Sequence, residues 1–456
     1  MNEKILQLYK AASDQRAPWL NRWDQCRRFA LPKSDADNAA LFDSTAGDGA
    51  ETLAANIFSL LTPPESAWLD LVADPAAAQD GAPDPAVVQA TLRAHLNESN
   101  FYTTIHQCYL DLVVCGTACL FMAETPIGSN SAFSFTAIPM NDIAVLRDQS
   151  DRITAVFHTA DIPACEVLER YPNWTPPANL RDAIKNDSSL PLRLVQSVVG
   201  ANFTAWLDVG GDLENNIVAT GSFQTNPYII FRWSAAAGEA YGRSPVMRAL
   251  PDIKTANKVV ELVLKNATIA VSGIWQADDD GIINLSNINL TPGAIIPKAV
   301  GSSGLTPLAP GADFDVSQLV LEDLRGRIRR AMLTDRMSAV NEKEMTATEV
   351  IARNTDMMRI LGATYGRILN ELIKPLIGRA LAILARRGAI CPIRLGTDAQ
   401  LKYNAPVSQL AADEKLSGML SFLAAANAGG FAELVNKPAL AAYIANAMHV
   451  PAELLI

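Results

Sequence analysis

The residues whose type and spacing suggest a binding role are lysines on a predicted helix. Lys254, Lys258 and Lys265 recur at intervals of four and seven residues, with Glu261 among them, so a single helical face carries a mainly basic stripe. Such a stripe could meet a polyanion, although a solvated helix surface produces the same pattern. The stripe is therefore a candidate site of weak contact with an anionic partner.

A second predicted helix, residues 317–333, carries further cations. Four arginines occupy its polar positions: Arg325, Arg327, Arg329 and Arg330. The apolar residues with helical spacing are expected to face the interior: Leu319, Val320, Leu324, Ile328, Ala331 and Met332. Two predicted helices with locally basic faces thus flank residues 273–315.

Patterns that would indicate an enzyme are missing from the sequence. It contains no GxxxxGK[ST], GxSxG or HExxH, so neither a phosphate-binding loop nor a common hydrolase site is expected. Glu342 and Glu344 flank Lys343, which favours a solvated loop over a catalytic pair of carboxylates. We predict a protein that is not an enzyme.

The thiols and imidazoles give no metal-binding pattern either. Six cysteines and four histidines are scattered without a CxxC or HxxxH pair, so no metal and no cofactor is expected. The cysteines are predicted to be reduced, buried and inert. Cys115 and Cys119 lie in an apolar run that suggests a core helix.

Composition limits the classes of protein further. The 456 residues are 49% hydrophobic, enough for two or three folded regions, and the formal net charge is -10. An acidic chain lacks the basic footprint of a protein that grips nucleic acid, so any DNA contact must be local or loose. We expect neither export nor a membrane span, since the N-terminus lacks signal-peptide features and no apolar stretch reaches about 18 residues.

The first half of the chain is predicted to be α+β. Apolar residues at helical spacing predict helices at 17–29, closed by Pro32, and at 51–61, stopped by Pro63 and Pro64. Runs rich in β-branched and aromatic residues predict strands at 153–158, 203–209 and 228–233.

The second half is predicted to be mainly helical. Residues 245–271 keep helical spacing over about seven turns. Residues 273–315 form a compact insertion, with strand-like pieces at 273–276 and 294–297. A capping box at Thr346 and Glu349 opens a helix of about 60 Å that ends at Gly388, and Pro375 should kink it just before that residue. The Ala- and Leu-rich tail, 405–456, is expected to pack against a neighbour.

Five short segments give the sequence a family resemblance. They are RAPWL from Arg16, LFDSTA from Leu41, LLTPP from Leu60, YGRSP from Tyr241 and MTATEV from Met345. In this order and spacing they resemble the head-to-tail connector (portal) proteins of short-tailed bacteriophages, over nearly the whole chain.

The resemblance implies a predominantly helical α+β portal fold, assembled as a ring of about twelve subunits. Its regions would be a wing (1–240), a first stem helix (241–272), a clip (273–315), a second stem helix (316–333), a tunnel loop (334–345), a long kinked helix with wing return (346–404) and a crown (405–456).

The implied function is a channel at one capsid vertex through which double-stranded DNA is packaged and ejected. Implied partners are the terminase large subunit, a tail adaptor, and the major capsid and scaffold proteins, in a virion assembled in the host cytoplasm. A structural capsid or tail-adaptor protein that does not surround DNA is the alternative. An acidic wall with narrow basic bands would let DNA slide, because affinity rises steeply with each neutralised phosphate.

By the same analogy, two groups of residues would face the DNA. The first lines the stem: Lys254, Lys258, Lys265, Arg325 and Arg329. The second belongs to the tunnel loop: Met337, Asn341, Glu342, Lys343 and Glu344.

Overall fold

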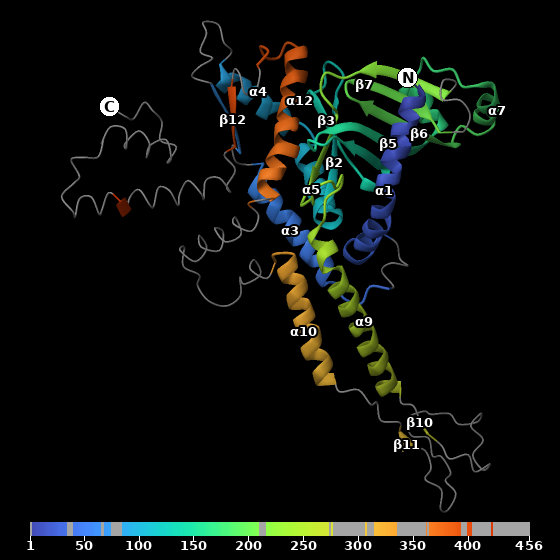
Figure 1. Ribbon diagram of the computed structural model, residues 1–456, viewed down its shortest axis with the longest axis vertical. Coiled ribbons are helices and arrows are strands. Elements are labelled where there is room, and N and C mark those ends of the chain that lie inside the picture. Colours follow the sequence, from blue (N-terminus) through green and yellow to red (C-terminus); the bar gives the residue numbers. More distant parts are fainter. Residues whose placement is uncertain are drawn as a thin grey trace, which may run out of the picture.

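The structure is a computed structural model. It describes residues 2–33, 40–64, 68–73, 84–208, 216–272, 275–276, 306–307, 314–334, 362, 364–393, 399–403 and 421–422. Within these residues, helices and antiparallel strands build a mixed body from which two helices project (Figure 1). The α+β prediction is confirmed at this level.

The N-terminal helix α1 (Asn2–Ala30) is longer than the predicted segment 17–29, and it ends before Pro32 as expected. Trp23 and Cys26, two of the apolar residues that predicted the helix, are fully buried, and Trp23 Nε1 donates to the carbonyl oxygen of Cys115 over 3.0 Å. The helix begins earlier than predicted because Ile5 and Ala12 of its first turns pack against the larger sheet.

Three further helices form the centre of the body. They are α3 (Thr45–Leu61), α4 (Pro85–Asn97) and α5 (Phe101–Cys115). Helix α5 is largely buried: nine of its fifteen residues are buried, including every residue from Leu112 to Cys115, while Thr103 and Gln107 are exposed. It ends at Gly116, whose φ of 80° is the left-handed conformation that glycine adopts freely.

Two antiparallel sheets follow. The smaller has the order β3-β2-β9, formed by β2 (Thr117–Glu124), β3 (Phe133–Ile138) and β9 (Tyr228–Arg232). The larger is a meander of β4 (Ile143–Arg147), β5 (Ile153–Pro163), β6 (Pro191–Val199), β7 (Asn202–Leu207) and β8 (Ile217–Ser222). Strands are therefore present at all three predicted positions.

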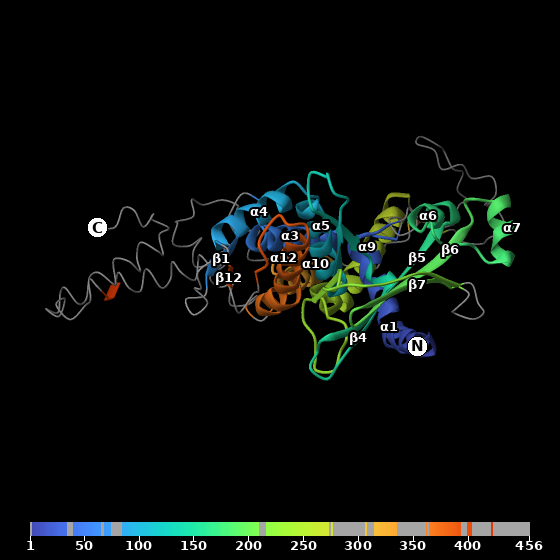
Figure 2. The same cartoon turned by 90° about the horizontal axis from the view of Figure 1, so that it is seen from above.

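The larger sheet is covered on both sides. Helix α1 supplies Ile5 and Ala12 against Phe157 and Trp206, while α6 (Ala164–Arg170) and α7 (Ala178–Asn186) belong to a separate cluster around Trp174. Seen from above, this sheet and its helices lie on one side of the body, and α3, α4, α5 and α12 lie on the other (Figure 2). A 3-10 turn, η1 (Met140–Asp142), leads into β4.

Strand β1 (Leu69–Ala73) pairs antiparallel with β12 (Ala399–Tyr403), so segments more than 300 residues apart lie side by side. No sequence pattern indicated either strand. Because β1 is short and β12 lies far along the chain, only the tertiary fold brings them together.

The projecting pair consists of α9 (Pro245–Ser272) and α10 (Phe314–Ala331), which run side by side away from the body (Figure 1). Both predicted helices are confirmed. Beyond their ends, β10 (Trp275–Gln276) pairs antiparallel with β11 (Thr306–Pro307). The strand expected at 273–276 is thus present in part, whereas the one expected at 294–297 lies outside the described residues.

Of the long helix predicted at 346–388, the structure describes residue 362 and residues 364–388. A π-helical turn, η3 (Leu369–Ile373), leads directly into α12 (Lys374–Arg386). A kink was expected just before Pro375, and the structure has this π-helical turn there, in which the backbone N–H of Lys374 donates to the carbonyl oxygen of Leu369, five residues back. Gly388, with a φ of 71°, follows the helix end as predicted. Residues 346–361 and nearly all of the tail lie outside the described residues.

Two expectations about side chains were wrong. Leu319 and Val320 are exposed, because they lie on the part of α10 that projects beyond the body, while Leu324, Ile328 and Met332 are buried as predicted. Cys119 lies on β2 rather than on a helix.

Not all the thiols are buried either: Cys165 and Cys391 are exposed. The other four cysteines are buried, and burial raises the pKa of the Cys26 thiol to about 12, which keeps that thiol protonated at neutral pH.

Candidate functional site

The base of the helix pair is firmly attached to the body. Ile253 of α9 and Ile328 of α10 are buried there. Asn257 Oδ1 accepts from the backbone N–H of Asp43 over 3.2 Å, and Arg325 Nε donates to Asp43 Oδ2 over 2.9 Å. The segment before α3 therefore binds both helices, and their direction relative to the body is fixed by buried polar contacts.

The outer part of the pair presents apolar side chains to solvent. Leu262 and Leu264 of α9 are each half exposed, and Leu319 of α10 is 76% exposed. These residues lie beyond the reach of the body, and the described part of the chain leaves them uncovered. Such a projection is typical of a surface that another molecule buries.

The predicted basic stripe is partly neutralised. Lys265 Nζ and Lys258 Nζ both donate to Glu261, over 2.6 and 2.9 Å, and these hydrogen bonds lower the pKa of Glu261. Lys254 lies nearer the body, where its Nζ donates to Gln25 Oε1 of α1 over 2.6 Å. The structure thus brings two of the lysines together around one carboxylate and places the third at a helix contact.

The two predicted arginines differ in their surroundings. Arg325 is held by Asp43, whose side chain is buried, and lies 3.4 Å from Glu322. Arg329 is exposed and forms no ion pair with a described residue, while its carbonyl oxygen accepts from the backbone N–H of Thr334 over 3.0 Å. Arg329 is the freer of the two to meet a partner.

The second predicted group, the five residues expected in a tunnel loop, is not among the described residues. Met337, Asn341, Glu342, Lys343 and Glu344 all lie outside the described residues.

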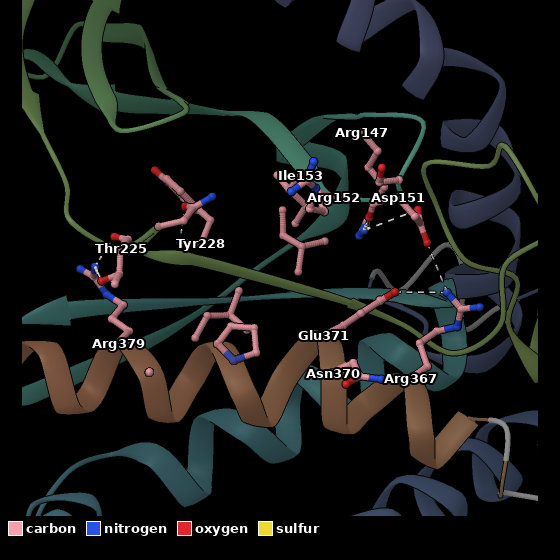
Figure 3. Close-up of a pocket in the computed structure, with 16 residues that line it drawn as sticks. Arg147, Asp151, Arg152, Ile153, Thr225, Tyr228, Arg367, Asn370, Glu371 and Arg379 are labelled. Carbon is pink, nitrogen blue, oxygen red and sulfur yellow. Dashed lines mark hydrogen bonds and ion pairs between the residues drawn. The ribbon is translucent and has the colours of Figure 1, made fainter. Parts of the chain in front are cut away.

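A buried ion-pair cluster, which the sequence analysis missed, joins the long helix to both sheets. Arg232, at the end of β9, is 1% exposed, and its Nη2 lies 2.6 Å from Glu371 Oε1 in η3. The same guanidinium bonds Asp151, in the turn between β4 and β5. Arg367 adds a second bond to Glu371 over 3.1 Å. Figure 3 shows the charged side chains of Asp151, Arg367 and Glu371 converging.

The π-helical turn explains how Glu371 reaches this position. Pro375 has no backbone N–H and cannot bond to the carbonyl oxygen of Glu371, so the helix widens by one residue before it. Glu371 then accepts from the backbone N–H of Arg232 over 2.9 Å as well as from its side chain. The only signal in the sequence was an arginine within the apolar strand around Tyr228–Arg232.

Neither a metal centre nor a membrane segment is found within the described ranges. They contain no cluster of three or more His, Cys, Asp or Glu side chains that could hold a metal ion. In the same part of the chain, no helix has both the length and the apolar character needed to cross a bilayer.

The chain was also compared with known protein families and with curated proteins. The profile of the "Bacteriophage head to tail connecting protein" family matches residues 2–455. The "Probable portal protein" of Bordetella phage BPP-1 is 21% identical over 408 residues, covering 80% of this chain and 71% of that protein. The "Portal protein" of Escherichia phage T7 is 21% identical over 398 residues, covering 81% and 72%.

Among solved structures, a chain from the neck of an empty GTA particle aligns over 93% of both chains. Its TM-score is 0.42 and its sequence identity is 12%.

Proposed function

Because the chain belongs to the family of bacteriophage head to tail connecting proteins, we propose that it works as the portal subunit of a phage head. In this proposal about twelve copies close into a ring, and double-stranded DNA passes through the axial channel during packaging and ejection. The helix pair forms the stem, the body between α1 and β9 forms the wing, and residues 273–315 form the clip.

The observation that best supports a ring is the exposed apolar surface on the outer half of the helix pair. Leu262, Leu264 and Leu319 lie on a projection that the body does not cover. Complete burial of one such side chain contributes about 1.5–3 kcal/mol, so contact between neighbouring stems would stabilise each interface by several times the thermal energy. A neighbouring copy offers the same surface, which suits repeated contact around a ring.

The charges suit a channel that does not hold DNA tightly. Lys258 and Lys265 share Glu261, so the three side chains carry one net positive charge, and Arg325 is already paired with Asp43. Weak and few phosphate contacts allow a duplex to slide. Of the predicted channel residues, we propose Lys258, Lys265 and Arg329 as the ones that meet the DNA.

The external partners are proposed from the family relationship. The terminase large subunit, and later a tail adaptor, would dock at the clip, beyond β10 and β11. The major capsid and scaffold proteins would surround the wing. The complex would be assembled in the host cytoplasm and become part of the virion.

Residues 334–345 are proposed as the tunnel loop. They begin at Thr334, whose hydroxyl and backbone N–H both donate to the carbonyl oxygen of Arg329 at the end of α10. Deleting residues 339–343 should leave rings intact and reduce genome packaging or retention. Normal packaging and retention by the deleted protein would place the loop away from the DNA.

A pair of matched variants tests the ring interface. Leu319→Glu places a charge on the projecting apolar surface, whereas Ile127→Glu places it at a loop tip that is 95% exposed. The mass of each purified protein is measured at micromolar concentration. We expect Leu319→Glu to lower the mass to that of dissociated subunits and Ile127→Glu to retain the wild-type mass. Unchanged assembly of Leu319→Glu would contradict the proposed stem contact.

A further inference from the structure

A cavity of about 830 Å³ lies between the long helix and the two sheets, with the ion-pair cluster at one end and Arg379 at the other (Figure 3). Its size falls within the range of small-molecule binding sites. Ile153 and Tyr228 form part of the wall between the two ends. The cavity therefore has charged ends and a partly apolar middle.

The wall of this cavity is positively charged in an acidic protein. It carries four arginines and two carboxylates: Arg147, Arg152, Arg367 and Arg379, with Asp151 and Glu371. The two carboxylates are also bonded by Arg232 from behind the wall. The wall thus has an excess of two positive charges, whereas the whole chain has a formal net charge of -10.

Arg147 lacks a full set of partners. Its side chain is 7% exposed, its Nη1 donates to the carbonyl oxygen of Asp151 over 2.9 Å, and its Nη2 is buried with no hydrogen-bond partner in the described structure. The nearest carboxylate oxygen in an ion pair is that of Asp151 at 3.8 Å, and Arg232 already binds that side chain. A buried guanidinium nitrogen without a partner is costly, and an anion would relieve the cost.

Arg379 is similarly uncompensated at the other end. Its side chain donates to the carbonyl oxygens of Met122 and Thr225, over 2.9 and 2.6 Å, and it forms no ion pair with a described residue. Burial, followed by repulsion from Arg386, lowers the pKa of Arg379 to about 10. The guanidinium is held by neutral oxygens and lies 5.7 Å from the centre of the Phe223 ring, so no carboxylate of the described residues pairs with its charge.

A neighbouring cavity of about 400 Å³ shares Arg147, Asp151 and Arg367 with the first. Its wall adds Asp148 and Glu239, so acids outnumber arginines there by three to two. An anion is therefore favoured in the larger cavity.

We propose that the larger cavity binds an oxyanion of the phosphate or carboxylate class at the end beside the ion-pair cluster, with Arg147 as its main charged contact and Arg379 adding positive potential from the other end. Guanidinium groups suit such ligands because they donate two parallel hydrogen bonds to a planar or tetrahedral oxyanion. The oxyanion could be a free small molecule or a carboxylate from a neighbouring copy. This binding site is independent of the proposed channel function.

Calorimetric titration of the full-length protein with inorganic phosphate tests the site, at an ionic strength held constant with sodium chloride. We expect saturable binding, and we expect Arg147→Met to weaken it about tenfold or more, as loss of a charge-assisted contact requires. Binding to both rings and dissociated subunits would identify a free oxyanion. Binding to dissociated subunits alone would identify the neighbour's carboxylate as the occupant.

A second pair of variants keeps the test valid if Arg147→Met does not fold. Arg152→Gln removes an exposed arginine of the cavity wall that pairs with Asp148 over 3.1 Å. Arg193→Gln removes an exposed arginine on β6 that pairs with Asp161 over 3.0 Å, away from the cavity. We expect phosphate affinity to fall about threefold in the first and to stay unchanged in the second. Absence of saturable binding in both assembly states, or equal affinity in the two variants, would overturn the proposal.

Discussion

Replacing Glu371 by Gln removes one negative charge from the buried cluster while the shape of the side chain is kept. Glu371 accepts hydrogen bonds from the backbone N–H of Arg232 over 2.9 Å, from Arg232 Nη2 over 2.6 Å and from Arg367 over 3.1 Å. After the substitution, the buried guanidinium of Arg232 keeps Asp151 as its only carboxylate partner in the cluster. The long helix would then be held less firmly to β9.

The expected loss of stability depends on how deeply Glu371 and the two arginines that bind it are buried. Breaking a fully buried pair costs about 3–5 kcal/mol, because the remaining charge is left uncompensated. Arg232 is buried, but the Glu371 and Arg367 side chains retain some exposure, and Gln still accepts a hydrogen bond. We therefore expect Glu371→Gln to lower the free energy of unfolding by about 2 kcal/mol.

Glu166→Gln is the matched control. Glu166 pairs with Arg170 over 2.6 Å on α6, and both side chains are more than 40% exposed, so the same chemical change should cost less than about 0.5 kcal/mol. Urea unfolding followed by tryptophan fluorescence compares the two variants with the wild type under identical conditions. Equal midpoints for Glu371→Gln and Glu166→Gln would refute the structural role of the cluster.

Three further outcomes are expected. Changing Lys258 and Lys265 to Glu should leave the ring mass unchanged and reduce packaged DNA, and normal packaging would mean that these lysines face solvent or a neighbour. Gly116→Ala should destabilise the protein by about 2–4 kcal/mol in urea unfolding, because the added carbon would lie 2.5 Å from the Gly242 carbonyl oxygen. Gly200 has open space around it, so Gly200→Ala should lower the free energy of unfolding by only about 1–2 kcal/mol. Equal losses of stability in the two variants would contradict the close approach of Gly116 to Gly242. Ellman's reagent should titrate at most two thiols per folded subunit, the exposed ones, and six after unfolding; a rapid third thiol would contradict the burial of the other four.

Helical periodicity predicted the projecting pair well because each helix buries one face at its base. The same periodicity could not reveal where the burial stops along the helix. Leu319 has the spacing of a core residue, yet it lies beyond the body, and its exposure depends on how far the pair projects. A side chain beyond that point can be buried only by a neighbouring molecule, and the sequence of one chain does not show where such a neighbour lies.

The charged cluster could not be predicted for a related reason. Arg232, Asp151 and Glu371 are separated by 81 and 139 residues, and only the packing of three elements brings them together. Pro375 predicted a kink in the helix, whereas the structure has a π-helical turn before it, which residue spacing alone does not indicate. The lysine stripe was correct as a pattern, whereas its neutralisation by Glu261 depended on rotamers that spacing alone does not fix.

The central proposal is a ring of subunits that surrounds DNA, and electron microscopy of the purified full-length protein tests it most directly. Images viewed down the symmetry axis should show closed rings of about twelve subunits with an open axial hole wide enough for a duplex, roughly 20 Å across. Monomers at micromolar concentration, or closed assemblies without an axial hole, would contradict the portal function and favour a capsid or tail-adaptor protein that does not surround DNA.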